Sequence, residues 1–165
     1  MELDKSRTCC FTGHRDIPDK HMIHLPVLLE KTIREQCQKG ARIFRTGGAI
    51  GFDSIAALKV IHLKNEFPDV KLELCLPCRD QSDKWSEYSR SVYNYILRNC
   101  DKVRYAADSY IPGCMHTRNR MLVDGADVCI AYYMGGNGGT AYTVSYALKN
   151  RLEFINLFDC FKKRT

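Results

Sequence analysis

Short hydrophobic runs alternate with longer amphipathic stretches along most of the chain. Runs rich in apolar and β-branched residues predict six strands, at residues 8–12, 42–46, 71–76, 102–105, 128–133 and 153–157. The stretches between them predict helices at about residues 19–39, 53–66, 86–99, 115–125 and 140–150. The chain therefore alternates between the two kinds of element.

This alternation indicates the fold class. In the stretch at residues 53–66 the apolar residues crowd one side, as expected of a helix that packs on a sheet; they are Ala56, Leu58, Val60, Ile61 and Leu63. Strands that alternate with such helices form a mostly parallel sheet covered on both faces. The sequence predicts an α/β protein, specifically a three-layer α/β/α sandwich.

Length and composition limit the alternatives. The chain has 165 residues, of which 45% are hydrophobic and 27% charged, as in ordinary globular proteins. We expect one domain over residues 1–165, and we exclude disordered, collagenous and fibrous chains. The longest apolar run, from Val128 to Met134, is far shorter than the roughly 20 residues of a membrane-spanning helix. No membrane association is expected.

Cysteine usage and net charge give weaker indications. The nine cysteines are an odd number, and the acidic N-terminus without an apolar core is not expected to be a secretory signal, so we expect reduced thiols in a cytoplasmic protein. Cys75 and Cys78 form a CxxC pair without a second pair, so no metal site is predicted. A net charge of +6 favours anionic partners but does not choose among a nucleotide, nucleic acid and a membrane surface.

Candidate ligand-binding loops follow three of the predicted strands: TGHR after the first, and glycine-rich loops after the second and fifth. Seven of the 11 glycines lie in the last two of these loops. The loops contribute the candidate phosphate-binding residues Thr12, Gly13, His14, Arg15, Gly47, Gly48, Gly51, Asp53, Gly135, Gly136, Gly138, Gly139 and Thr140. Ligands of open parallel sheets bind outside the carboxyl ends of the strands, where glycine allows close approach and a helix N-terminus attracts anions. The alternative role of these glycines is to form tight turns. Neither of the last two loops matches the GxGxxG pattern of dinucleotide-binding proteins or the GxxxxGK[ST] pattern of the Walker A loop.

Two arginines begin the helix expected before the fifth strand. Arg120 lies four residues before Asp124, so we expect these two to form a surface ion pair. Arg118 has no acidic residue at the same spacing and is free to bind a phosphate or carboxylate through its guanidinium group. His14 and His116 fall in the same segments and suit hydrogen-bond donation to an anion.

Two further residues each have two interpretations. Trp85, the only tryptophan, follows the third strand and either stacks on a nucleobase or covers part of the core. Asp53 begins a helix, so capping that helix is its favoured role, with a catalytic role as the alternative.

Four motifs together resemble a known family. TGHR, GGAIGFD, MHTRNRML and GGNGGT occur in this order between about residues 7 and 158. The set is similar to the SLOG superfamily, which groups the Smf/DprA proteins with the LOG phosphoribohydrolases, and within it to the YpsA-like branch. This resemblance implies a Rossmann-like sheet and a cleft, formed by these loops, for a nucleotide or nucleotide-derived ligand.

The resemblance can also be applied residue by residue. LOG enzymes use an arginine in an MHxRK segment and a glutamate just after PGGxGT. Arg118 occupies the arginine position, and Asn119, which replaces the lysine, joins the candidate ligand-binding residues. Tyr142 and Thr143 stand where the glutamate belongs, and glycoside cleavage requires a carboxylate. Asp53 is the only carboxylate in a glycine loop that can substitute.

Three functions follow, in order of preference. The first is a binding or sensing domain for a nucleotide-derived phosphorylated small molecule, without a cofactor. The second is a nucleoside-monophosphate phosphoribohydrolase that uses Arg118 and Asp53 as catalytic residues. The third is a Smf/DprA-like binder of single-stranded DNA, ranked last because Lys and Arg are spread along the chain rather than clustered. The oligomeric state, including a homo-oligomer, stays open.

Overall fold

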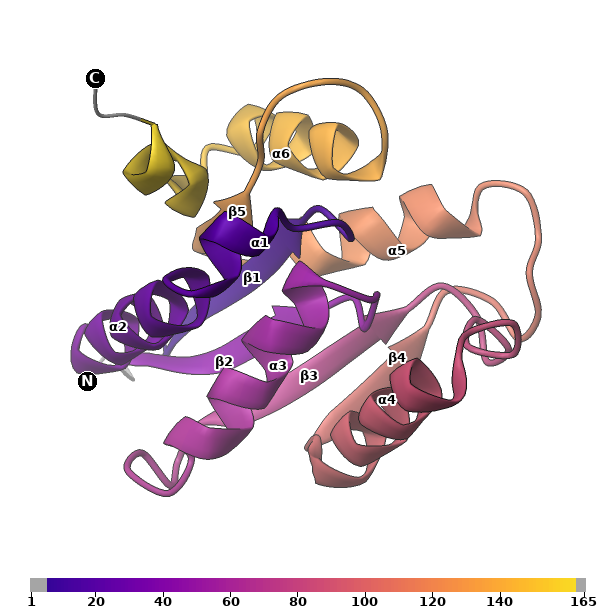
Figure 1. The fold of residues 1–165 in the computed structure, drawn as a ribbon, viewed down its shortest axis with the longest axis horizontal. Coiled ribbons are helices and arrows are strands. Elements are labelled where there is room, and N and C mark those ends of the chain that lie inside the picture. Colours follow the sequence, from indigo (N-terminus) through magenta and orange to yellow (C-terminus); the bar gives the residue numbers. More distant parts are fainter. Residues whose placement is uncertain (1–5, 163–165) are drawn as a thin grey trace, which may run out of the picture.

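A six-stranded sheet runs through the middle of the protein in the computed structural model, which describes residues 6–162 (Figure 1). The strands are β1 (Arg7–Gly13), β2 (Ala41–Thr46), β3 (Lys71–Leu76), β4 (Lys102–Tyr105), β5 (Val128–Tyr132) and β6 (Glu153–Asn156). Their order is β4-β3-β2-β1-β5-β6, and all neighbouring pairs are parallel. The predicted parallel sheet is confirmed.

Helices cover both faces of this sheet. They are α1 (Asp19–Met22), α2 (Leu25–Gln38), α3 (Phe52–Leu63), α4 (Glu87–Asn99), α5 (Cys114–Val123), α6 (Gly139–Lys149) and a 3₁₀ helix at Leu157–Phe161. Helices α2, α3 and α4 lie side by side on one face, and α5 and α6 lie on the other (Figure 1). The predicted Rossmann-like three-layer sandwich is therefore confirmed. The single domain over 1–165 stays a prediction, because residues 1–5 and 163–165 lie outside the described part.

The helix expected at residues 19–39 is two helices. α1 ends at Met22, and α2 begins at Leu25 with Pro26 in its first turn. Proline has no backbone N–H and restricts the residue before it, so it fits the first turn of a new helix but not the interior of a continuous one. The sequence prediction was wrong here because it followed the hydrophobic pattern across this proline.

Alternating strand residues supply two separate cores. In β1, Cys9 and Phe11 face α2 and α3, and the Phe11 ring stacks on Phe44 of β2 at 5.9 Å between centroids. Cys10, between them, faces α5 and α6 and pairs in register with Cys129 of β5. This alternation, typical of strands, buries the central strands on both faces.

The cysteines serve mainly as small core residues. All nine are free thiols, and seven of them are buried. Burial raises the pKa of Cys9 to about 12 and that of Cys78 to about 11, so both thiols stay protonated at neutral pH. Cys100 is half-buried, and Cys160, in the 3₁₀ helix, is exposed.

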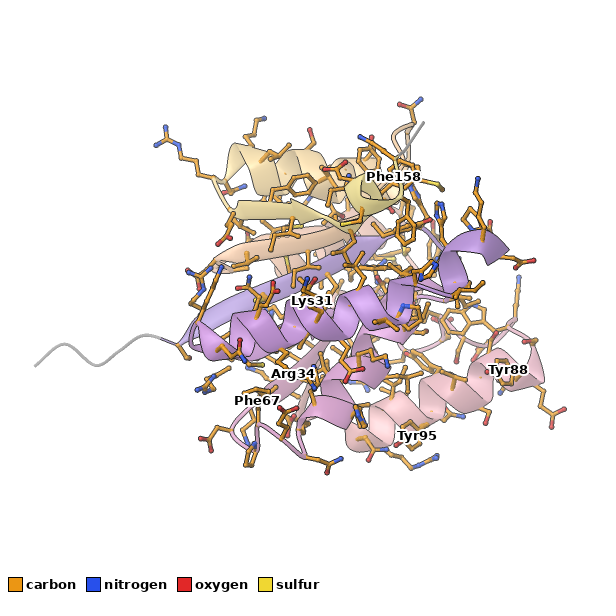
Figure 2. All side chains as sticks on the ribbon, turned by 60° about the vertical axis from the view of Figure 1, so that its left-hand side comes forward. Lys31, Arg34, Phe67, Tyr88, Tyr95 and Phe158 are labelled. Atoms are coloured by element: carbon orange, nitrogen blue, oxygen red, sulfur yellow. The ribbon has the colours of Figure 1, made fainter. Side chains whose placement is uncertain are left out.

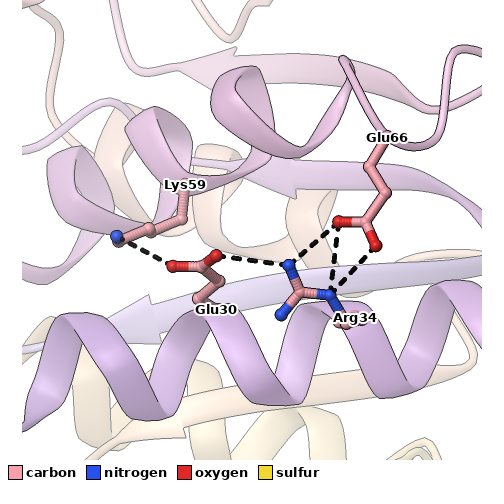
Figure 3. A network of polar contacts seen from close by, with 4 residues as sticks. All are labelled: Glu30, Arg34, Lys59 and Glu66. Carbon is pink, nitrogen blue, oxygen red and sulfur yellow. Dashed lines mark hydrogen bonds and ion pairs between the residues drawn. The ribbon is translucent and has the colours of Figure 1, made fainter.

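An ion-pair network joins α2 to α3 and to the turn after it (Figure 3). Glu30 accepts from Lys59 at 3.2 Å and from Arg34 at 3.3 Å, and Arg34 in turn bonds Glu66 at 2.9 Å. These side chains remain about a quarter to a half exposed, so solvent screens them, and each pair contributes about 1 kcal/mol or less. Hydrophobic packing provides most of the stability.

The carboxyl ends of β1 and β5 define the position of the site. The chain order reverses between these two strands: β2, β3 and β4 follow on one side of β1, and β5 and β6 on the other. Open α/β sheets bind ligands at such a switch point. Within residues 6–162, none of the helices is long and apolar enough to cross a membrane.

A pair of aromatic substitutions tests the core. Phe44 is fully buried, so Phe44→Ala should lower the free energy of unfolding by about 3–5 kcal/mol. Tyr88 is 79% exposed on α4 (Figure 2), and Tyr88→Ala should change it by less than about 0.5 kcal/mol. Urea denaturation of both variants measures the difference; equal losses would contradict this assignment of the core.

Candidate ligand-binding cleft

Loops from three strands converge with the start of α5 around one cleft of about 400 Å³. The loop after β1, the loop between β2 and α3, and the loop between β5 and α6 contribute to it. The lining residues are Thr12, Gly13, His14, Arg15, Ala49, Asp53, Met115, His116, Arg118, Asn119, Leu122, Asn137, Gly139 and Thr140. Residues that are far apart in the sequence thus meet at the switch point.

His14 joins the first and third loops. Its Nε2 accepts a hydrogen bond from the backbone N–H of Met134 at 2.8 Å, so the ring is neutral with its proton on Nδ1. Partial burial lowers the pKa of His14, which favours the same neutral form. The Nδ1–H group is therefore available as a hydrogen-bond donor.

The first and second loops pack backbone against backbone. Gly51 has a φ of 87°, and a Cβ at this position would overlap the carbonyl group of Arg15. Gly51 also precedes the first residue of α3 as its N-cap. Only glycine fits both the conformation and the close approach, so this predicted residue shapes the cleft without lining it.

Arg118 is buried beneath the cleft and is fixed by two hydrogen bonds. It is only 5% exposed. Its Nη1 donates to the carbonyl oxygen of Gly47 at 2.5 Å, and its Nε donates to Oδ1 of Asn119 at 2.8 Å. No described residue accepts from Nη2, which solvent reaches through the cleft. A side chain at position 47 would collide with this guanidinium group, which explains the glycine there.

The bond from Arg118 fixes the orientation of the Asn119 amide. Because arginine only donates, the oxygen of Asn119 must face it, and the NH₂ group points the other way. Asn119 is 5% exposed, and no described residue accepts from its Nδ2. This nitrogen lies 3.7 Å from the place that a Cβ of Gly139 would occupy, at the start of α6. A donor without a protein acceptor therefore lies beside the N-terminus of α6.

Asp53 brings a buried carboxyl group to the same cleft. It is 6% exposed, and its Oδ2 accepts from the backbone N–H of Ala49 at 3.2 Å. Burial raises the pKa of Asp53 to about 6, against the opposing effects of Arg118, of the Ala49 N–H and of Arg15. The predicted capping role is wrong, because Gly51 is the N-cap of α3 and the carboxyl group bonds the preceding loop.

Arg120 does not form the predicted ion pair with Asp124. Its guanidinium donates instead to the hydroxyl groups of Tyr142 at 2.9 Å and Thr117 at 3.3 Å. The Asp124 carboxylate accepts from Tyr146 at 2.6 Å. Tyr142 and Tyr146 of α6 thus replace the ion pair that was expected between Arg120 and Asp124. The i,i+4 spacing within α5 cannot reveal partners on another helix. Arg120 is not among the cleft-lining residues.

Several predicted residues lie outside the cleft lining. They are Gly47, Gly48, Gly51, Trp85, Gly135, Gly136 and Gly138. Gly135, Gly136 and Gly138 all have positive φ, with open space where a Cβ would lie, so they set the path of the loop without a close contact. Gly48 instead lies against Leu76 and Gln81.

Trp85 lines a neighbouring pocket of about 410 Å³ that shares Arg15 and Met115 with the cleft. Its ring also meets Tyr93 edge to face at 5.3 Å and packs against the core. Both interpretations of this residue therefore retain structural support.

Sequence reasoning missed four lining residues: Ala49, Met115, Leu122 and Asn137. Ala49 and Asn137 lie within the predicted glycine loops, and Met115 and Leu122 lie within the predicted arginine helix. They line the cleft because of where the backbone places them and which side of the helix they occupy, and composition reveals neither. No group of three or more His, Cys, Asp or Glu side chains suited to a metal ion occurs among residues 6–162.

Two known proteins are similar to this chain in sequence. An uncharacterised SPbeta prophage-derived protein, YoqJ, from Bacillus subtilis is 30% identical over 121 residues, which cover 66% of this chain and 71% of YoqJ. A UPF0398 protein of Bacillus thuringiensis is 27% identical over 120 residues, covering 69% of this chain and 63% of that protein. The match thus spans less than two thirds of the UPF0398 relative.

Two solved structures of DNA processing protein A share the fold. The Helicobacter pylori protein, described for its single-stranded DNA binding mode, has a TM-score of 0.65 and 22% identity over 92% of this chain and 65% of its own. The Streptococcus pneumoniae protein has the same TM-score and 16% identity over 90% of this chain and 49% of its own.

The family comparison covers most of the chain, including all three loops and α5. The family model described as the YspA SLOG family matches residues 10–156. The chain belongs to the YspA SLOG family.

Proposed function

We propose that the cleft binds a nucleotide or a nucleotide-derived phosphorylated small molecule, as a binding or sensing domain. The phosphate lies at the start of α6, beside Gly139 and Thr140. Family membership and the Rossmann-like sheet support a nucleotide-binding type of domain. In this proposal the polar groups of the cleft bind the ligand.

The observation that carries this proposal is a pair of donors on α5 that have no protein acceptor and open into the cleft. The Nη2 of Arg118 and the Nδ2 of Asn119 have no acceptor among the described residues, and neither atom is sealed from solvent. Other hydrogen bonds already hold both side chains in place, so little further ordering is needed when an anion replaces water at these donors. An anion at the N-terminus of α6 would accept from these side chains and from free helix N–H groups.

The second glycine loop is a poorer place for phosphate than the third. Its Ala49 N–H already donates to the Asp53 carboxyl group, and its Gly47 carbonyl accepts from Arg118. A phosphate beside Asp53 would also be repelled once that residue is ionised. These contacts favour the α6 side for the anion and leave the β2–α3 loop to hold Arg118.

The shape of the site favours a small molecule over a nucleic-acid strand. Binding of single-stranded DNA generally uses an open basic groove with exposed aromatic stacking surfaces. Here the two donors belong to side chains that are only 5% exposed and line a cleft of about 400 Å³. The DNA binding described for the Helicobacter pylori neighbour therefore does not transfer directly to these residues.

The phosphoribohydrolase alternative receives less support. Tyr142 stacks on His116 at 4.2 Å and accepts from Arg120, and the hydroxyl of Thr143 donates to the carbonyl of Gly139. Both side chains at the glutamate position are therefore engaged within the protein, and neither is a carboxylate. Asp53 remains the only acidic side chain that lines the cleft.

Matched arginine variants test the site. Arg118→Ala should weaken binding of AMP at least about tenfold, because it removes a buried cationic donor. Arg120→Ala, two residues away on the same helix and bonded to Tyr142, should leave the affinity unchanged. Isothermal titration calorimetry measures both, with circular dichroism to verify folding.

Two outcomes would contradict the proposal. If folded Arg118→Ala binds AMP as tightly as the unmodified protein, the site is misplaced. If AMP is converted to free adenine during the titration, the protein is a hydrolase rather than a binding domain.

The charge of Asp53 in the free cleft has a measurable effect on stability. Its pKa of about 6 in the folded protein exceeds the ordinary value of 3.8, so unfolding releases a proton between these pH values. The free energy of unfolding should therefore fall as the pH rises from about 4 to 6, by on the order of 2 kcal/mol more than in Asp53→Asn. Urea denaturation from pH 4 to 7 without ligand gives both curves; parallel curves would mean that water solvates Asp53.

A further inference from the structure

We propose that Asp53 binds a ribose hydroxyl of the ligand, so that the cleft selects ribonucleotides over their deoxy counterparts. This inference rests on the proposed function. It assigns the buried carboxyl group a specificity role that is separate from binding of the phosphate.

The carboxyl group of Asp53 accepts only one hydrogen bond from the described residues. A carboxylate offers about four lone-pair positions, and the structure fills one of them, with the Ala49 N–H. Arg118 lies close enough to stabilise the charge but forms no ion pair with it. The other oxygen, Oδ1, has no donor among the described residues and is reached through the cleft. Such an acceptor gains free energy when a ligand supplies a donor.

The charges around Asp53 restrict which ligand group it accepts. From α5 it is faced by Arg118, from the loop after β1 by Arg15, and the same cleft holds His14 and His116. A phosphate oxygen carries no proton to donate and would repel the carboxylate, so it belongs elsewhere. A sugar hydroxyl is neutral and donates a strong, charge-assisted hydrogen bond to a carboxylate.

The two adjoining pockets offer places for the phosphate, the sugar and the base of a nucleotide. The start of α6, with Asn119 beside it, takes the phosphate at one end. Asp53 lines the same cleft, and the pocket of Trp85 adjoins that cleft through Arg15 and Met115. A nucleotide has its sugar between phosphate and base, so a ligand with its base in the Trp85 pocket presents its sugar to Asp53.

Deoxy analogues test the role of Asp53 directly. The probes are AMP, 2′-deoxy-AMP and 3′-deoxy-AMP, titrated calorimetrically into the full chain. At least one deoxy analogue should bind about tenfold more weakly than AMP, the loss expected for a hydrogen bond to a charged group. In Asp53→Ala this preference should disappear, because AMP loses the bond and the analogue has none to lose.

Asp69→Ala is the matched control, since Asp69 is exposed and lies outside the cleft; it should keep the tenfold preference. Equal affinities of the unmodified protein for all three probes would overturn the inference but leave the proposed function intact. A preference that persists in Asp53→Ala would also overturn it. If none of the probes binds, the proposed function fails and this inference with it.

Discussion

The hydrogen bond from Arg118 to the carbonyl oxygen of Gly47 is the contact on which the site depends. It joins α5 to the loop after β2, two segments 71 positions apart in the sequence. The bond requires a glycine at position 47, because any side chain would occupy the place of the guanidinium group. It also fixes Arg118 so that its Nε orients the Asn119 amide toward α6. One backbone carbonyl thereby positions two donors from α5 in the cleft.

The other end of α5 is also held by arginine. Arg45 of β2 donates to the carbonyl oxygen of Asp124 at 2.6 Å, and Arg104 of β4 donates to that of Met121 at 3.4 Å. Cations at a helix C-terminus satisfy free carbonyl groups and interact favourably with the helix dipole. Because β2 provides both Arg45 and, just beyond its end, Gly47, this strand and its loop contact α5 near both ends. Such support keeps the cleft side chains of α5 in a fixed place relative to the sheet.

The sequence revealed the sheet more fully than the site. Strand runs such as residues 71–76 were predicted with their observed bounds, because buried parallel strands are continuously apolar or alternate with a period of two. Convergence of the loops also follows from a general rule for parallel sheets. The hydrogen-bond partners of individual side chains do not follow from such a rule. Arg120 donates to Tyr142 instead of pairing with Asp124, and Asp53 accepts from the loop before α3 instead of capping that helix. These choices depend on contacts between distant segments, which local spacing does not encode.

The distribution of thiols has a chemical consequence. The raised pKa values of buried cysteines such as Cys9 and Cys78 keep their sulfur atoms in the unreactive protonated form and away from reagents. Cys160 is the one exposed thiol within residues 6–162, and it lies in the 3₁₀ helix rather than in the lining of the cleft. A maleimide dye or a spin label will therefore attach first at Cys160, so the native chain can carry a spectroscopic reporter without any engineered attachment point.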